Sequence, residues 1–338
     1  MNYILSNTKV RVRFNGKDYL CVSEETVLEA LLRQGAEFPH ACRQGVCFAC
    51  LSKAVVGRVP EEAQKGLKET LRHKGYFFPC LCRPVEDLEI SGPDERQVYS
   101  RAVVIGVERC SRTVCRVFLS PAMPFSYHPG QYITLRRGDG LLRSYSLASV
   151  PREDDYLEIH VRRHENGRMS GWIFEELAVG DRLDIQGPSG ACFYTPGERV
   201  RPLLLIGTGT GLAPLIGIAR DALHHGHLGP IYLYHGSRDP DGLYLKEELA
   251  RMQAAWPNFH YAPCVSGGSA IQGHWRGRVD DIAFAEHPHL RAWRVFVCGA
   301  PPMVHAARKR AYLAGAALTD IHGDAFEPRE PTGKSRVA

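Results

Sequence analysis

The chain has 338 residues, of which 44% are hydrophobic, and a formal net charge of +5. We expect this length to form two or three domains, because single hydrophobic cores rarely grow so large. The apolar runs are too short to span a bilayer, and no basic tract is typical of a nucleic-acid-binding arm. The N-terminal residues lack the apolar core and cleavage site of a signal peptide, so we expect a cytoplasmic protein without membrane or nucleic-acid partners.

The N-terminal segment predicts a hairpin followed by a helix. Residues 8–22 alternate between apolar and polar side chains around Asn15-Gly16, the strongest short-range hairpin signal. Thr26–Gln34 has the spacing of an amphipathic helix, which Gly35 would end. Two further strands are expected at Lys53–Val56 and Leu88–Ile90.

Cysteines between these strands have the spacing of a metal centre. Cys42, Cys47 and Cys50 form C-x4-C-x2-C, which is the plant-type [2Fe–2S] spacing. Zinc sites usually present two C-x2-C pairs, and disulfides suit secreted proteins, so we favour an iron–sulfur cluster. By spacing alone, the fourth ligand could be Cys80 or Cys82.

A polar segment with Gly and Pro, Ser91–Arg101, predicts a linker. Short alternating segments separated by turn residues follow it as far as Pro196, and they predict an antiparallel barrel. One helix, Ser170–Leu177, interrupts them. The expected strands are Val103–Val107, Val114–Leu119, Gln131–Leu135, Tyr156–Arg162 and Arg182–Gln186.

After Pro202 strands alternate with helices, which predicts a parallel sheet with right-handed crossovers. Pro302 suits the first position of the last helix, and Gly315 suits the position after its end. The expected strands are Leu203–Ile206, Ile231–His235, Phe259–Val265 and Arg294–Cys298, and the expected helices are Leu212–Leu223, Leu243–Ala254 and Pro302–Ala314.

The hairpin, helix and cysteine loop together resemble the β-grasp fold of plant-type ferredoxins. Phe78–Pro84 resembles the ferredoxin segment in which a strand ends at a ligand and an x-Pro pair follows. That resemblance implies Cys80 as the fourth ligand and leaves Cys82 as an additional thiol. The ligands of the [2Fe–2S] cluster would then be Cys42, Cys47, Cys50 and Cys80.

A second resemblance concerns the predicted barrel. His128–Leu135 (HPGQYITL), followed by Arg143-Ser144-Tyr145-Ser146, resembles the FAD domain of the ferredoxin-NADP reductase superfamily. The resemblance implies that Arg143 binds the FAD pyrophosphate with its fork of donors. It also implies that Tyr145 packs against the flavin and that Ser146 reaches flavin N5. The alternative is a plain strand with a surface arginine.

Further FAD contacts are expected where the predicted helix of this region begins. Gly167, Arg168, Met169 and Ser170 would present N–H groups to a phosphate, and Ser170 is also a plausible N-cap. The strand residues that the resemblance places beside the flavin's ribityl chain and diphosphate are His160, Val161 and Arg162.

A glycine-rich turn follows the buried strand Leu203–Ile206, where a dinucleotide pyrophosphate can approach the backbone. Leu212 replaces the third glycine of G-x-G-x-x-G, but the segment matches the G-x-G-x-G-x-A-P form of the reductase superfamily. The residues expected to contact the pyrophosphate are Gly207, Thr208, Gly209, Thr210 and Gly211.

The nicotinamide end is expected near Cys298-Gly299, which matches the C-G-x-P segment of the superfamily. A buried packing thiol is the alternative role for Cys298. Phe326 is the candidate aromatic beside the isoalloxazine, although it could simply anchor the last strand. The resemblance thus assigns Ser146, Cys298 and Phe326 as positioning groups around the hydride path, with no general base.

The loop after Ile231–His235 should lie near the adenosine ribose. A 2′-phosphate needs positive partners, whereas a free 2′-OH favours an acidic one. Arg238 stands there against Asp239 and Asp241, so we expect NADH to be preferred over NADPH, with Arg238 contacting the nucleotide.

The order of the expected domains resembles the reductase components of bacterial multicomponent oxygenases. It implies electron transfer from NADH to FAD, then to the [2Fe–2S] cluster, and finally to an oxygenase partner. Alternatives are a reductase for nucleotide-sugar deoxygenation, a stand-alone flavin, quinone or ferric reductase, and a redox sensor. The expected boundaries are 1–92 for the ferredoxin domain, 93–100 for a linker, 101–198 for the FAD barrel, 199–328 for the α/β NAD domain and 329–338 for a tail.

Overall fold

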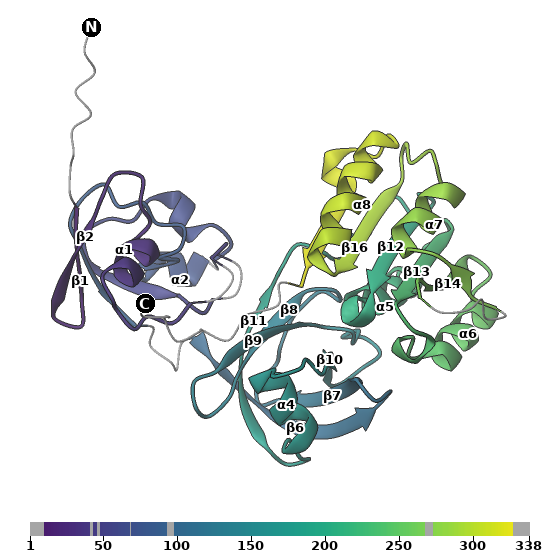
Figure 1. The fold of residues 1–338 in the computed structure, drawn as a ribbon, viewed down its shortest axis with the longest axis horizontal. Coiled ribbons are helices and arrows are strands. Elements are labelled where there is room, and N and C mark those ends of the chain that lie inside the picture. Colours follow the sequence, from purple (N-terminus) through teal and green to yellow (C-terminus); the bar gives the residue numbers. More distant parts are fainter. Residues whose placement is uncertain are drawn as a thin grey trace, which may run out of the picture. The chain divides into compact units, whose positions relative to one another are not determined.

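The chain divides into two compact units, residues 1–100 and 101–338 (Figure 1). Their sheets follow the predicted order: a small mixed sheet, an antiparallel barrel and a parallel sheet with helices on both faces. The computed structural model describes residues 10–40, 43–45, 48–67, 69–92, 98–267 and 273–326.

The first unit contains a five-stranded β-grasp sheet with a helix against it. Its elements are β1 (Val10–Phe14), β2 (Lys17–Cys21), α1 (Val27–Arg33), β3 (Ser52–Val56), a 3-10 turn (Glu61–Gln64), α2 (Glu69–His73), β4 (Tyr76–Phe77) and β5 (Leu88–Ser91). The strand order is β2-β1-β5-β3-β4, with β1 and β5 parallel. The predicted hairpin is confirmed, because Asn15 and Gly16 both take positive φ between β1 and β2.

Helix α1 positions the segment that contains Cys80. The Thr26 hydroxyl accepts the Glu29 N–H, and the Glu29 carboxylate accepts the Thr26 N–H at 2.9 Å, so the helix starts with a capping box. The N–H groups of Val27 and Leu28 donate instead to the carbonyls of Cys82 and Pro79. These bonds tie the helix start to the chain on both sides of Cys80.

The second unit begins with a six-stranded antiparallel sheet in the order β10-β7-β6-β11-β8-β9, which a bridge between Leu147 and Ile159 closes into a barrel. Its helix starts at Arg168, two residues earlier than predicted, and its N-cap is Gly167 rather than Ser170. The elements are β6 (Ser100–Arg109), β7 (Val114–Pro121), β8 (Tyr132–Arg136), β9 (Leu142–Ser146), β10 (Leu157–Arg162), α4 (Arg168–Glu175) and β11 (Arg182–Ser189).

The remainder of this unit is a six-stranded, all-parallel sheet in the order β15-β14-β13-β12-β16-β17. Helices α5 and α6 cover one face, and α7 and α8 cover the other (Figure 1). The elements are β12 (Leu203–Thr208), a 3-10 turn (Gly209–Gly211), α5 (Leu212–His224), β13 (Ile231–Ser237), a 3-10 turn (Pro240–Gly242), α6 (Lys246–Ala255), β14 (Phe259–Val265), β15 (Trp275–Arg276), α7 (Val279–Glu286), β16 (Arg294–Gly299), α8 (Pro301–Leu313), a 3-10 turn (Leu318–Asp320) and β17 (Ile321–Ala325).

Two predicted helix starts in this region are wrong. Helix α6 begins at Lys246 instead of Leu243, because Leu245 has a left-handed backbone with φ 56°. Helix α8 begins at Pro301, one residue before the predicted start, so Pro302 is its second residue rather than its first. Helix α7 and strands β15 and β17 were not predicted.

The barrel half (101–198) and the sheet half (199–326) share one hydrophobic core. Ala148, Cys192 and Tyr194 of the barrel half pack with apolar residues of α5 and β12, and we call this cluster the shared core. A Cβ at Gly217 of α5 would lie 3.1 Å from the carbonyl oxygens of Leu147 and Ala148. Helix and barrel therefore approach closely at a position that favours glycine.

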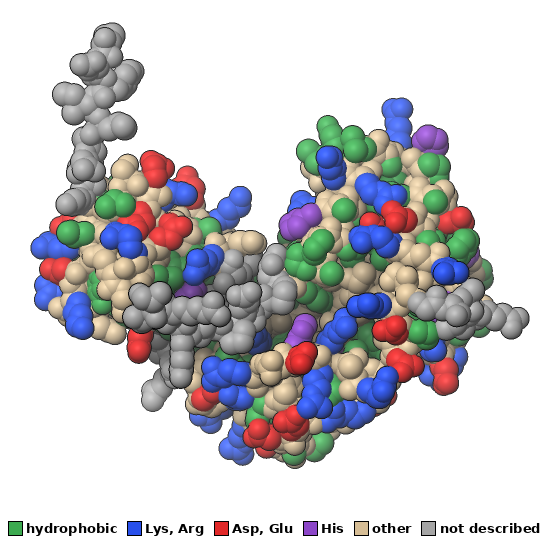
Figure 2. Space-filling view, in the orientation of Figure 1, with side chains coloured by type: hydrophobic (Ala, Val, Ile, Leu, Met, Phe, Trp, Pro, Cys, Tyr) green, Lys and Arg blue, Asp and Glu red, His purple; other side chains and the backbone are tan. Residues whose placement is uncertain are grey.

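Charge is dispersed over the surface. Lys and Arg are interspersed with Asp and Glu on the face of each unit seen in Figure 2. None of the helices in the described part of the chain combines the length and apolar character that crossing a bilayer requires.

Candidate functional site

The predicted cluster ligands Cys50 and Cys80 lie together at the end of β4 and the start of β3. Their Sγ atoms are 3.4 Å apart. This is too long for a disulfide, and it is close to the roughly 3.8 Å edge of a tetrahedron with metal–sulfur bonds of about 2.3 Å. The pair therefore fits two thiolates on one iron. Cys42 and Cys47 lie outside the described residues, and the described ones alone contain no group of three metal-ligating side chains.

The surroundings favour Cys80 over Cys82 as the fourth ligand. Cys50, Cys80 and Cys82 are all buried in the same apolar cluster, and the Sγ atom of Cys80 is the one that lies 3.4 Å from that of Cys50. Gly45 has φ 71°, and a Cβ there would lie 2.3 Å from Cδ1 of Leu81. Gly45 thus lies directly against the segment that contains Cys80, with the close approach that only glycine allows.

Successive side chains of the predicted FAD motif point to opposite faces of strand β9. Ser144 shares a hydrogen bond of 2.9 Å with Thr134 of β8, so its hydroxyl joins the two strands. Arg143 and Tyr145 lie on the other face, both half-buried, and the Arg143 guanidinium also donates to the Leu142 carbonyl at 2.7 Å. Burial raises the pKa of Tyr145. Its phenol is therefore neutral beside any bound flavin.

The first turn of α4 can offer backbone groups, rather than side chains, to a phosphate. Met169 is buried in the barrel core, and Arg168 forms an ion pair with Asp139 at 3.1 Å. The Ser170 hydroxyl accepts the His164 N–H and donates to the Gly167 carbonyl. These side chains are already engaged, whereas the first N–H groups of a helix have no intrahelical acceptor. A phosphate fits this turn through the backbone.

The side chains of β10 point in two directions. Val161 lies in the barrel core, so it could contact a flavin only through its backbone. Glu158, His160 and Arg162 point outward to the sheet half. The Arg162 guanidinium is exposed, and its Nη1 lies 3.2 Å from the position of a Cβ at Gly209. Arg162 therefore lies against the turn expected to bind NAD, rather than only beside the FAD diphosphate.

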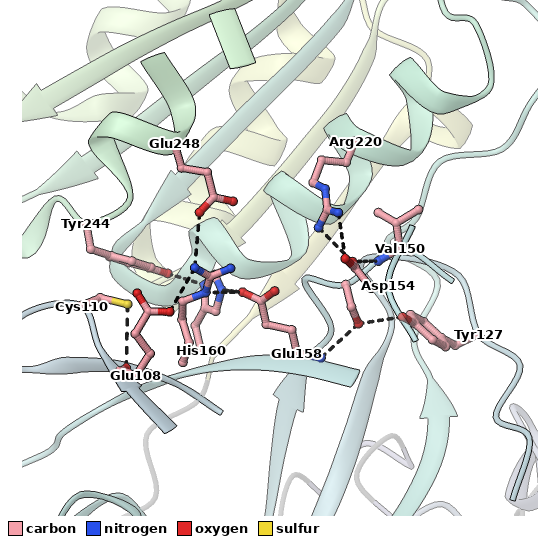
Figure 3. Close-up of polar contacts among 12 residues, drawn as sticks. Glu108, Cys110, Tyr127, Val150, Asp154, Glu158, His160, Arg220, Tyr244 and Glu248 are labelled. Carbon is pink, nitrogen blue, oxygen red and sulfur yellow. Dashed lines mark hydrogen bonds and ion pairs between the residues drawn. The ribbon is translucent and has the colours of Figure 1, made fainter. Parts of the chain in front are cut away.

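A buried polar network occupies the same face of β10 (Figure 3). The Glu158 carboxylate accepts from Arg116 Nε at 2.6 Å and from His160 Nε2 at 2.8 Å. Burial alone would raise the pKa of Glu158, but the hydrogen bonds from His160 and Arg116 lower it to about 2. Arg116 also contacts Glu248 of α6 at 3.3 Å, and His160 Nδ1 contacts the Tyr244 hydroxyl at 2.8 Å. The sequence did not indicate this network.

The glycine turn, residues 207–211, packs too closely for a side chain at its first or last position. A Cβ at Gly207 would lie 2.7 Å from Leu215, and one at Gly211 would lie 2.2 Å from the Cys298 carbonyl oxygen. Thr208 Oγ1 accepts the Ala300 N–H at 2.9 Å, which joins the ends of β12 and β16. Thr210 lies in the 3-10 turn that leads into α5. The resulting backbone surface at a helix start fits a pyrophosphate.

The loop with Arg238 is less acidic than its sequence indicates. Asp241 forms an exposed ion pair with Arg112 of the barrel half at 3.1 Å. The loop and its neighbour thus contribute two arginines and two aspartates. The electrostatic argument against a 2′-phosphate therefore loses part of its basis.

Ser146, Cys298 and Phe326 are brought together where β9 meets the carboxyl ends of β16 and β17. Ser146 Oγ donates to Asp324 at 3.2 Å, Asp324 pairs with Cys298 in the sheet register, and the Phe326 N–H donates to the Gly299 carbonyl at 2.8 Å. Desolvation raises the pKa of Asp324 to about 6, and the Ser146 hydroxyl partly opposes this shift.

Cys298 is fully buried, with its Sγ 3.6 Å from that of Cys192. Burial raises the pKa of Cys298 far above its usual value, so the group is a neutral thiol. Sequence reasoning missed both Asp324 and Cys192. Nothing local marks either of them, because their partners are distant in the chain.

Together the fold and these sites define a flavin- and iron–sulfur-dependent oxidoreductase. Three family models match: a 2Fe-2S iron-sulfur cluster binding domain over residues 12–85, an oxidoreductase FAD-binding domain over 104–194 and an oxidoreductase NAD-binding domain over 205–309. The cofactors predicted from the sequence are thereby confirmed at the level of domains.

Relatives match over nearly the whole chain. The reductase subunit of an aromatic O-demethylase from Amycolatopsis sp. is 36% identical, covering 94% of this chain and 98% of that protein. A ferredoxin–NAD(P)+ reductase component of naphthalene 1,2-dioxygenase/salicylate 5-hydroxylase systems from Ralstonia sp. is 32% identical, covering 90% and 94%. The crystal structure of an Amycolatopsis cytochrome P450 reductase aligns with TM-score 0.68 and 33% identity, covering 94% and 99%. The chain belongs to this family of iron–sulfur flavoprotein reductases.

Proposed function

We propose that this protein is a cytoplasmic reductase component that takes electrons from NADH and passes them through FAD and a [2Fe–2S] cluster to an oxygenase component. The observation that carries the proposal is the meeting of Ser146 from the barrel half with Cys298 and Phe326 from the sheet half. This meeting supports a flavin site and a nicotinamide site that adjoin each other. The relative named as a reductase component of naphthalene 1,2-dioxygenase/salicylate 5-hydroxylase systems supports the choice of partner.

When bound, FAD would accept a hydride and release its two electrons singly, and the cluster would carry one electron at a time. The protein's part is to bind and to orient. Arg143 and the first turn of α4 would hold the FAD phosphates, and the glycine turn with Arg162 would hold those of NADH. The Ser146 hydroxyl would face the flavin, and the buried, neutral Cys298 thiol would pack behind the nicotinamide site. Cys42, Cys47, Cys50 and Cys80 would hold the cluster.

The test compares two electron acceptors with the full chain. Wild-type protein should reduce both ferricyanide and cytochrome c with NADH, because the first can take electrons from flavin and the second needs the cluster. Cys50→Ser should keep ferricyanide reduction and lose cytochrome c reduction. Equal cytochrome c rates in the two proteins would refute the proposed route through the cluster. Comparing kcat/KM for NADH and NADPH at one ionic strength tests the choice of nucleotide.

A further inference from the structure

Tyr244 links the barrel half to the sheet half through contacts buried from water. It precedes α6, is 2% exposed, and its hydroxyl lies 2.8 Å from His160 Nδ1 of β10. A carboxylate only accepts, so His160 Nε2–H donates to Glu158, and His160 Nδ1 shares the second hydrogen bond with the Tyr244 hydroxyl. Figure 3 shows Tyr244 and Glu248 pointing from the sheet half toward Glu158 and His160.

The other side of Tyr244 faces the glycine turn. Its ring meets the ring of His235 edge-on, with the centroids 5.6 Å apart. His235 lies on β13, is fully buried, and donates from Nε2 to the Gly209 carbonyl at 3.1 Å. Burial lowers the pKa of His235 to about 4, so its ring is neutral and keeps a single tautomer. A continuous buried path therefore runs from β10 through Tyr244 and His235 to Gly209.

The backbone beside Tyr244 is strained. Leu245 follows it with φ 56°, in the left-handed region, and it packs at the edge of the shared core. Non-glycine residues rarely adopt this region, because their Cβ comes too close to the following carbonyl oxygen. Such conformations persist only where surrounding contacts over-determine them. The contacts that hold the Tyr244 phenol between His160 and His235 therefore coincide with a strained backbone at Leu245.

We propose that Tyr244 is a positioning residue that holds the glycine turn of the NAD site at a fixed distance from the flavin-binding barrel, through His160 on one side and His235 on the other. This inference rests on the proposed hydride transfer from NADH to FAD. Misplacement by about 1 Å can cost roughly a hundredfold in rate. The Tyr244 contacts can fix the distance between the two nucleotide sites, because they lie between these sites and are shielded from water.

The test is rapid-mixing reduction of the FAD-loaded, full-length protein by NADH under anaerobic conditions. Tyr244→Phe keeps the edge-on ring contacts with His160 and His235 and loses the hydrogen bond, and we expect a saturating flavin-reduction rate about tenfold lower. Tyr244→Ala loses all three contacts, and we expect a rate about a hundredfold lower. The NADH concentration for half-saturation should change less than threefold, and the NADH–flavin charge-transfer absorbance should weaken in the same order. Tyr312→Phe, at an exposed tyrosine of α8, is the matched control.

A rescue variant separates positioning from packing. His160→Gln can donate to Glu158 and accept from Tyr244, so we expect most of the rate to remain. His160→Leu cannot do either, and it should match Tyr244→Phe. Unchanged rates per bound FAD in both Tyr244 variants would overturn the inference, as would equal loss in His160→Gln and His160→Leu. If NADH does not reduce the FAD of the wild-type protein, that result refutes the proposed function rather than the role of Tyr244.

Discussion

Replacing Glu158 by Gln should destabilise the second unit strongly. The side chains of Glu158 and Arg116 are 3% and 13% exposed. A hydrogen bond to a charged group contributes about 1.5–3 kcal/mol, and a buried donor left unpaired costs about 1–3 kcal/mol. The glutamine carbonyl can keep one of the two bonds, and Arg116 keeps Glu248. We therefore expect the free energy of unfolding to fall by about 2–4 kcal/mol, or roughly 4–16 °C in Tm.

Urea and thermal unfolding of the holoprotein measure this loss. The pKa of Glu158 is lowered from its ordinary 4.5 to about 2, so its stabilisation is complete above pH 4.5 and disappears as the pH falls toward 2. The difference between wild type and Glu158→Gln should accordingly be constant near neutral pH and shrink below pH 4.5. Glu175→Gln removes an exposed ion pair with Arg163 and should cost under about 0.5 kcal/mol. Similar losses in the two variants would refute the reasoning.

Three further predictions concern the cofactor sites. Cys80→Ser should abolish the visible [2Fe–2S] spectrum and Cys82→Ser should preserve it; the reverse result would move the fourth ligand. Arg143→Ala should weaken FAD binding about tenfold to a hundredfold, since a charged contact of roughly 1.5–3 kcal/mol is lost, and unchanged FAD content after dialysis would contradict its role. Asp324→Asn should remove a pH dependence of stability: with its pKa raised to about 6, the wild-type carboxyl stabilises the fold below its ordinary 3.8 and loses that contribution as the pH rises through 6. If the unfolding free energies of wild type and Asp324→Asn, measured in urea, change in parallel between pH 3.8 and 6, Asp324 is not desolvated.

Motifs that act over a few residues could be predicted from the sequence. Asn15-Gly16 determined the hairpin because both positions need positive φ, and the glycine turn was recognisable because side chains would clash there. Helix starts were less predictable. The left-handed Leu245 delays α6, and no residue type in that segment signals it.

Contacts between distant residues escaped prediction for a different reason. Ser146 and Asp324 are 178 positions apart, and His160 and Tyr244 are 84 apart. Their partnership depends on how the barrel and the sheet pack, which no local pattern encodes. Strand β17 was missed as well, because its short Ile321–Ala325 sequence contains a glycine and no apolar run.

The shared core has a consequence for exchanging modules between reductases. A cut between residues 198 and 199 would leave Ala148, Cys192 and Tyr194 on one fragment and the apolar face of α5 on the other, both open to water. Neither fragment should be soluble alone, and a sheet half transplanted from a relative would need a small residue at the position of Gly217. Recombination should therefore succeed at the boundary near residue 100, where the two compact units meet in sequence, and fail inside the second unit.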